Sequence, residues 1–288
     1  MVISSLDLAD KNDLTFLAEL IGDLRTAAQA WEPLVVGAMA RDLLLFYAHA
    51  IPIPRATEDI DLGFAVTDWE DFAALRAALI ASTSFEPHQR VAHKIFHRGN
   101  REIDLIPFGG VEQADGSIAW PPQGEEVMTV VGYREALGSA IDLKLPENQR
   151  VLVVSLPMLA VLKLVAWSER HSAARRKDAT DLLLILENYL DAGNQQRLYE
   201  EAPHLLGDSN FDYERAGAWL AGQDAANALQ TEDAMQTGKR KRISAILAKE
   251  SDPEGPLALI GEVGGRDAER MRLLLAAFLR GFTGEKIS

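Results

Sequence analysis

The sequence contains no cysteine. Without thiols the chain has no disulfide framework, no thiolate metal site and no catalytic cysteine. Long apolar runs are also missing, because no stretch approaches the roughly 18 residues that a membrane-spanning helix needs. Residues 1–11 carry Asp7 and Asp10 and no apolar core, so they do not predict a secretory signal. These absences lead us to expect a cytoplasmic protein that does not contact a membrane.

Positive charge is the scarcer sign: the chain has 29 Lys and Arg residues against 43 Asp and Glu residues, for a formal net charge of −14. An acidic chain repels polyanions at long range, which argues against a general nucleic-acid-coating role. Two local basic clusters stand out, one between Arg170 and Lys177 and one from Lys239 to Arg242. We interpret each first as a solvated helix face, although a focused basic patch can still bind a phosphate or an RNA end.

Several catalytic motifs are absent as well. The chain has no P-loop, no Gly-x-Gly-x-x-Gly, no His-Glu-x-x-His and no Gly-x-Ser-x-Gly. His88, His93 and His97 lie close together in the sequence, but neither a cysteine nor a supporting carboxylate accompanies them. We therefore interpret them as ordinary surface histidines.

The pattern of apolar residues changes near residue 155. Before it, helix and strand signals alternate, whereas after Leu156-Pro157 almost every segment has a helical period. Strands followed by a run of helices are typical of an α+β fold, so we expect a first domain at 1–155 and a helical domain at 156–288. The expected helices of the first domain lie at 13–31, 38–48 and 68–81, the last of them capped by Asp68. Its expected strands lie at 34–36, 60–66, 91–96 and 102–107, with weaker strands at 126–131, 140–145 and 150–154. The expected helices of the second domain lie at 157–168, 175–190, 211–229, 231–250 and 267–282.

A glycine turn joins the short strand Val35-Val36 to a helix start at Gly37-Ala38. Glycine lets the backbone approach a ligand closely, and the free N–H groups of a helix N-terminus can bind phosphate oxygens. Any strand-to-helix turn can need a glycine, so this feature alone does not establish a phosphate site.

Two further segments place carboxylates on strands. Asp59 and Asp61 alternate with apolar residues, so on a strand they project from one face, and they form the only Asp-x-Asp of the chain. Two such carboxylates repel each other unless a cation lies between them. Asp104 interrupts an otherwise apolar strand between Ile103 and Leu105. Taken singly, each segment could also be an acidic, solvent-facing strand.

The order of these three segments resembles the nucleotidyltransferase core of the DNA polymerase β-like superfamily. The resemblance implies a small mixed sheet flanked by helices and followed by a C-terminal helical region. It implies that Asp59 and Asp61 bind two Mg²⁺ ions, and that Asp104 binds the catalytic ion and takes the proton of the acceptor hydroxyl. Gly37, Ala38 and Arg41 would hold the phosphates, although many members have Gly-Gly or Gly-Ser where this chain has Gly-Ala.

A second resemblance lies in the helical half. Lys163, Trp167 and Arg170 share one helix face, and Lys177-Asp178-Ala179-Thr180-Asp181-Leu182 follows. This pattern is similar to predicted bacterial nucleotidyltransferases related to the AbiEii/AbiGii-type toxins. It implies that Lys163, Arg170 and Lys177 bind nucleotide phosphates, with Asp178 and Asp181 in a supporting role. The alternative for Lys163 is a lysine that snorkels to the surface.

The sequence therefore predicts a Mg²⁺-dependent nucleotidyltransferase that moves an NMP from an NTP to an acceptor hydroxyl. The acceptor could be a tRNA or other RNA end, a protein side chain or a small molecule. The alternative is a catalytically inactive nucleotide-sensing or interaction module. A toxin held by a partner antitoxin is a further possibility that the chain alone does not decide.

Overall fold

The computed structural model describes residues 5–53, 55, 57, 59–121, 124, 127–170, 173–207, 211–230, 234–264 and 268–285. Contacts between Cα atoms divide the chain into two compact units, Met1–Ser155 and Leu156–Ser288. The division falls where the sequence changes from a mixed pattern to a helical one. Within the described ranges, no helix is long and apolar enough to span a membrane.

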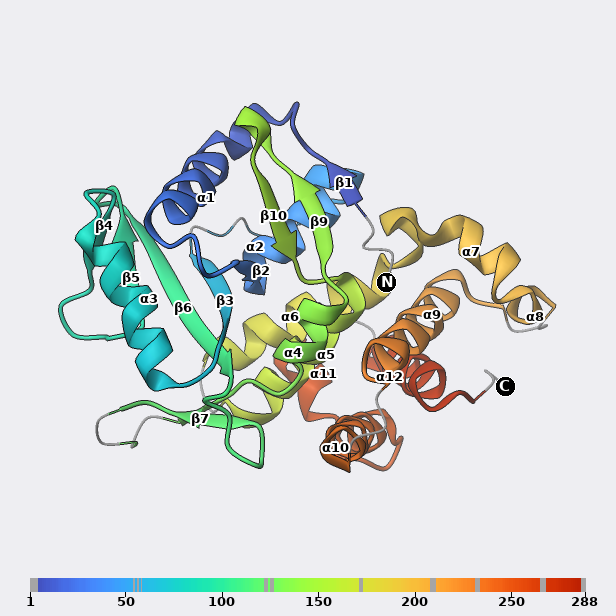
Figure 1. Cartoon of the computed structure of the whole chain (residues 1–288). Coiled ribbons are helices and arrows are strands. Elements are labelled where there is room, and N and C mark those ends of the chain that lie inside the picture. The colour runs from blue at the N-terminus through green and yellow to red at the C-terminus, as the bar shows by residue number, and fades with distance from the viewer. Residues whose placement is uncertain are drawn as a thin grey trace. The chain divides into compact units, whose positions relative to one another are not determined.

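The first unit contains a mixed sheet with the strand order β1-β9-β10-β2-β3-β6-β5-β4 (Figure 1). β3 pairs in parallel with β6, whereas β2 with β3 and β5 with β6 are antiparallel. A separate pair is formed by β7 and β8. The bounds are β1 (Ser5–Asp7), β2 (Leu34–Val36), β3 (Ile60–Val66), β4 (Phe85–Pro87), β5 (Lys94–His97), β6 (Arg101–Gly109), β7 (Ser117–Ala119), β8 (Val127–Thr129), β9 (Ile141–Lys144) and β10 (Arg150–Val153).

Helices of the first unit connect and cover these strands. Asp68 caps one of them, because its side chain accepts a hydrogen bond from the amide of Asp71, as the sequence predicts. A second helix begins at Gly37 and widens into a π-helical segment from Asp42. The bounds are η1 (Asn12–Leu14), α1 (Thr15–Ala27), α2 (Gly37–Arg41), η2 (Asp42–Tyr47), α3 (Trp69–Ala81), α4 (Tyr133–Gly138) and η3 (Pro146–Asn148).

Helices are the only regular secondary structure in the described part of the second unit. Close backbone contact between α9 and α12 depends on glycine, since a Cβ at Gly222 would lie 2.1 Å from the carbonyl oxygen of Phe278. The reciprocal atom at Gly281 would lie 1.9 Å from the carbonyl oxygen of Trp219. The bounds are α5 (Leu156–Glu169), α6 (Ala173–Glu187), η4 (Leu190–Asn194), α7 (Gln195–Glu200), α8 (Pro203–Leu206), α9 (Tyr213–Ala228), α10 (Ala234–Ser251), α11 (Ala258–Val263) and α12 (Ala268–Thr283).

The predicted fold class, a mixed sheet flanked by helices and followed by a helical region, is confirmed. The strands expected at 34–36 and 60–66 have the predicted bounds. The predicted hairpin is also present, and Arg98 and Gly99 at its turn have φ angles of 47° and 76°. The short strands β1, β4 and β7 and the short helices α4, α7, α8 and α11 were not predicted, because so few residues show no periodicity.

Candidate active site

Asp61 and Asp104 lie opposite each other on the neighbouring strands β3 and β6. Paired residues of adjacent strands point to the same face, and the strands lie about 4.8 Å apart, so the two carboxylates are neighbours. On the opposite face, Ile60 and Leu62 are buried at 1% and 0% exposure. The alternation expected for β3 is therefore present, and it brings two of the three predicted aspartates together.

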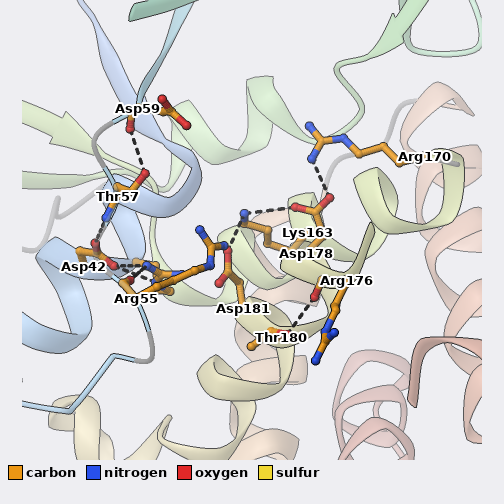
Figure 2. A network of polar contacts seen from close by, with 11 residues as sticks. Asp42, Arg55, Thr57, Asp59, Lys163, Arg170, Arg176, Asp178, Thr180 and Asp181 are labelled. Atoms are coloured by element: carbon orange, nitrogen blue, oxygen red, sulfur yellow. Dashed lines mark hydrogen bonds and ion pairs between the residues drawn. The ribbon is translucent and has the colours of Figure 1, made fainter. Parts of the chain in front are cut away.

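Asp59 lies just before the first residue of β3 and is exposed to solvent. Its position outside the strand means that strand geometry does not fix the direction of its side chain. The hydroxyl of Thr57 donates to the backbone oxygen of Asp59 at 3.4 Å (Figure 2). The third predicted aspartate thus stands at the entrance to β3, next to the pair on the sheet.

The turn at Gly37 packs directly against the carboxylate of Asp61. Gly37 has a φ of 65°, and a Cβ added to it would lie only 1.9 Å from Asp61 Oδ2. Val36, the residue before it, pairs with Asp61 across β2 and β3. Only glycine fits this position, both in backbone conformation and in space. The predicted phosphate turn, with Ala38 as the second residue of α2, therefore begins beside the aspartate pair.

Lys94 is a residue at this site that sequence analysis did not identify. It lies on β5 opposite Asp104, with its Nζ 3.1 Å from Asp104 Oδ1, and it also forms an ion pair with Glu102. Burial lowers the pKa of Lys94, but the hydrogen bond to Glu102 and the negative charges of Glu102 and Asp104 outweigh burial, so the pKa is raised and the ammonium stays charged. The predicted hairpin contained the signal, since a turn centred on Gly99 places residue 94 opposite residue 104.

Arg41, predicted to contact phosphate, is completely buried. Its Nε donates to Asp42 Oδ1 at 2.7 Å, and its Nη2 donates to the carbonyl oxygen of Arg55 at 2.9 Å. The second oxygen of Asp42 accepts from the amide of Thr57 at 3.3 Å (Figure 2). The guanidinium is therefore engaged inside the fold, where it ties α2 and η2 to the segment that leads to Asp59. A phosphate contact would require these bonds to open.

The predicted residues of the helical unit form a second polar cluster. Lys163 of α5 is 9% exposed, and its Nζ lies 3.2 Å from Asp178 Oδ1 and 2.8 Å from Asp181 Oδ2, both on α6 (Figure 2). Arg170 Nη1 donates to the other oxygen of Asp178 at 2.7 Å. Lys163 is thus a buried, paired lysine and does not snorkel. Lys177 is exposed.

One histidine interpretation is wrong. His97 is 3% exposed, its Nε2 lies 2.8 Å from Asp23 Oδ2, and its ring packs on Phe85. Asp23 comes from α1, so the contact depends on how this helix packs on the hairpin, which the local sequence around the histidines does not reveal. His97 is a core residue that joins α1 to β5.

The donor chemistry of the aspartate pair suits a hard divalent cation. Among the described residues, no three His, Asp or Glu side chains form a ready-made metal group. Asp104 Oδ1 is nevertheless buried without a well-aligned hydrogen bond, because Lys94 approaches it as an ion contact only. Such an oxygen is a suitable ligand for Mg²⁺, and Asp61, held against the glycine turn, supplies another.

A mixed sheet with two paired aspartates beside a glycine turn is the arrangement expected of a nucleotidyltransferase core. Over residues 25–254 the chain matches the family described as "Nucleotidyl transferase AbiEii toxin, Type IV TA system". This range covers most of the sequence, so the chain belongs to this nucleotidyltransferase family, and the resemblance stated above is confirmed. Among curated proteins, no significant match is found.

Proposed function

We propose that the protein is a metal-dependent enzyme that transfers an NMP from an NTP to an acceptor hydroxyl. The observation that carries this proposal is the pairing of Asp61 with Asp104 on one sheet face, against the turn at Gly37. Membership of a nucleotidyltransferase family supports the same reaction. In it, the acceptor oxygen attacks the α-phosphorus, the bond to the bridging β-phosphate oxygen breaks, and pyrophosphate leaves.

Asp59, Asp61 and Asp104 would hold two Mg²⁺ ions. In such sites two cations roughly 3.5–4 Å apart activate the attacking hydroxyl and stabilise the leaving oxygen. Asp104 would also accept the proton of the acceptor hydroxyl. The amides that follow Gly37, including that of Ala38, would donate to the phosphate oxygens at the start of α2. The carboxylate of Asp61 lies against the same turn, which supports this role.

The assignment of Lys163, Arg170 and Lys177 to phosphate binding stays part of this proposal. Lys163 is already paired with the buried carboxylates of Asp178 and Asp181, and Arg170 is paired with that of Asp178. A phosphate at this cluster would therefore bind to cations whose charge is partly neutralised. Arg170, about half exposed, is the more accessible of the two paired cations, and Lys177 is exposed on α6.

The name of the family suggests the biological setting. It describes toxins of type IV toxin–antitoxin systems, so we propose that this chain acts in the cytoplasm as the toxin half of such a pair, with an antitoxin partner. The acceptor is an RNA end, a protein or a small molecule, and the net charge of −14 disfavours a long nucleic-acid track. The rival function is that of an inactive nucleotide-sensing module.

The test is a labelling experiment. The wild-type protein and the Asp59→Asn, Asp61→Asn and Asp104→Asn variants are incubated with each α-labelled NTP and total cell extract, with and without Mg²⁺, and the labelled product is sized. We expect label transfer only by the wild type with Mg²⁺, and by a control variant, Asp10→Asn, whose side chain is 78% exposed. Transfer that survives Asp61→Asn would contradict the proposal. Mg²⁺-linked NTP binding without transfer would favour the sensing module.

A further inference from the structure

Lys94 gives the aspartate pair an internal cation. The register places Lys94, Glu102 and Asp104 on the same face of the sheet, the face that also carries Asp61. On the neighbouring strands β3, β5 and β6, this face carries the carboxylates of Asp61, Glu102 and Asp104 and the ammonium of Lys94. Lys94 and Asp104 keep 27% and 28% of their side-chain surface exposed, so both groups can be reached from solvent, although Oδ1 of Asp104 itself is covered.

The two contacts of Lys94 are unequal. Glu102 accepts a hydrogen bond from the ammonium, whereas Asp104 Oδ1 lies 3.1 Å from Nζ without hydrogen-bond alignment. A lysine ammonium is a compact charge with three donors on a flexible stem. Lys94 can consequently leave Asp104 and keep Glu102 as its partner. Glu102 on β6 thus remains as the partner of the ammonium once Lys94 leaves Asp104.

We propose that Lys94 is a positioning residue that takes the cation position at Asp104 until a divalent metal replaces it, and that Glu102 then retains the ammonium. This inference rests on the proposed function, because it assumes that Asp104 is a metal ligand. In the metal-free protein Lys94 neutralises the repulsion between Asp61 and Asp104 and keeps Asp104 on the sheet face. The same ammonium competes with the metal, so it weakens divalent-ion binding at Asp104.

The experiment measures divalent-ion affinity directly, without turnover. Mn²⁺ binding is followed by electron paramagnetic resonance of the free ion and by calorimetry, for the wild type and for Lys94→Met, which keeps the stem and removes the charge. We expect about tenfold tighter Mn²⁺ binding in the variant, a value within the usual range of coupling between two binding events. Glu102→Gln should act in the opposite direction, because the ammonium then has only Asp104 as an anionic partner.

Two controls separate the local effect from a general change of charge. Lys144→Met removes an equivalent charge from β9, with three strands between it and β6, and should leave Mn²⁺ affinity unchanged. In an Asp104→Asn background, Lys94→Met should no longer tighten binding. Unchanged affinity in Lys94→Met, or an equal gain in the Asp104→Asn background, would overturn the inference.

Failure of the proposed function gives a different result. If Asp61→Asn binds Mn²⁺ as tightly as the wild type, the aspartates do not form the metal site, whatever Lys94 does. Folding of each variant is checked by circular dichroism. Lys94→Gln keeps a donor for Glu102 while losing the charge, so it should reproduce the tighter binding even if the methionine variant does not fold.

Discussion

Replacing Asp42 by asparagine would remove the carboxylate that binds the buried guanidinium of Arg41. The pair is almost inaccessible, with 0% and 5% of the two side chains exposed. Breaking a buried ion pair by removing one partner costs about 3–5 kcal/mol, because an uncompensated charge stays in the core. Asparagine keeps a hydrogen-bonding oxygen, and Arg41 keeps its hydrogen bond to the carbonyl of Arg55. We therefore expect the free energy of unfolding to fall by about 3 kcal/mol, the lower end of this range.

The double replacement Arg41→Met with Asp42→Leu tests the same reasoning. Apolar residues of similar volume can replace a buried pair at little cost, so the double variant should lose less stability than Asp42→Asn alone. Urea denaturation followed by far-ultraviolet circular dichroism gives the change in the free energy of unfolding. The pair does not form the buried unit described above if Arg41→Met and Asp42→Leu alone each cost under about 1 kcal/mol, or if their two effects simply add in the double variant.

A functional readout accompanies the stability measurement. Asp42 holds the amide of Thr57, two residues before Asp59, and Arg41 holds the carbonyl of Arg55. Loosening this segment should weaken Mn²⁺ binding in Asp42→Asn under conditions where the variant is fully folded. If Arg41 is instead a phosphate ligand, Arg41→Met should weaken NTP binding far more than Mn²⁺ binding, and our assignment of Arg41 to the fold would be refuted.

Three other predictions follow from single contacts. Gly37→Ala should lower the melting temperature and the Mn²⁺ affinity together, because its Cβ would clash with Asp61, whereas Gly238→Ala, with open space around it, should do neither. Lys163→Met should destabilise the fold by about 3–5 kcal/mol in urea denaturation, because the ammonium is removed from between two buried carboxylates and Arg170 pairs with Asp178 alone. Burial raises the pKa of Asp23, but its hydrogen bonds outweigh burial and lower the pKa below 3.8. The contribution of Asp23 to stability is therefore present above pH 3.8 and is lost as the pH falls through the lower pKa of the folded state. In Asp23→Asn, the free energy of unfolding should depend less on pH in this acidic range.

The sequence allowed a correct prediction of the strands that carry the site. Val35-Val36 and the segment at 60–66 are apolar runs of strand length bounded by turn residues, and the hairpin turn at Gly99 is visible as a glycine among polar residues. The period of a strand also predicted that Ile60 and Leu62 point away from Asp61. The residues of β3 and β6 do not show by themselves that the two strands are adjacent. The pairing of Asp61 with Asp104 therefore followed only from the resemblance to the nucleotidyltransferase core.

Side-chain partners were harder to predict than elements. Arg41 follows small residues on a helix that is buried on several sides, and the pattern does not say whether its guanidinium points to a ligand or to the next residue, Asp42. His97 depends on a helix more than 70 residues away in sequence. Lys94 is the exception, because the hairpin register alone would have placed it opposite Asp104. Local patterns therefore predicted elements and cross-strand neighbours, and left longer-range partners open.

The two lysine clusters offer a comparison within one chain. Lys94 and Lys163 each sit between two carboxylates, on β6 in the first case and on α6 in the second. They differ in burial, since 27% of the Lys94 side chain is exposed but only 11% of that of Lys163, and the partners of Lys163 are almost completely buried. A partly solvated pair contributes about 0–1 kcal/mol, whereas removing one partner of a buried pair costs several times more. Methionine at position 94 should therefore change metal affinity with little loss of stability, and methionine at position 163 should chiefly destabilise the fold. The opposite ranking of the two stability losses would show that burial does not separate the exchangeable cation from the structural one.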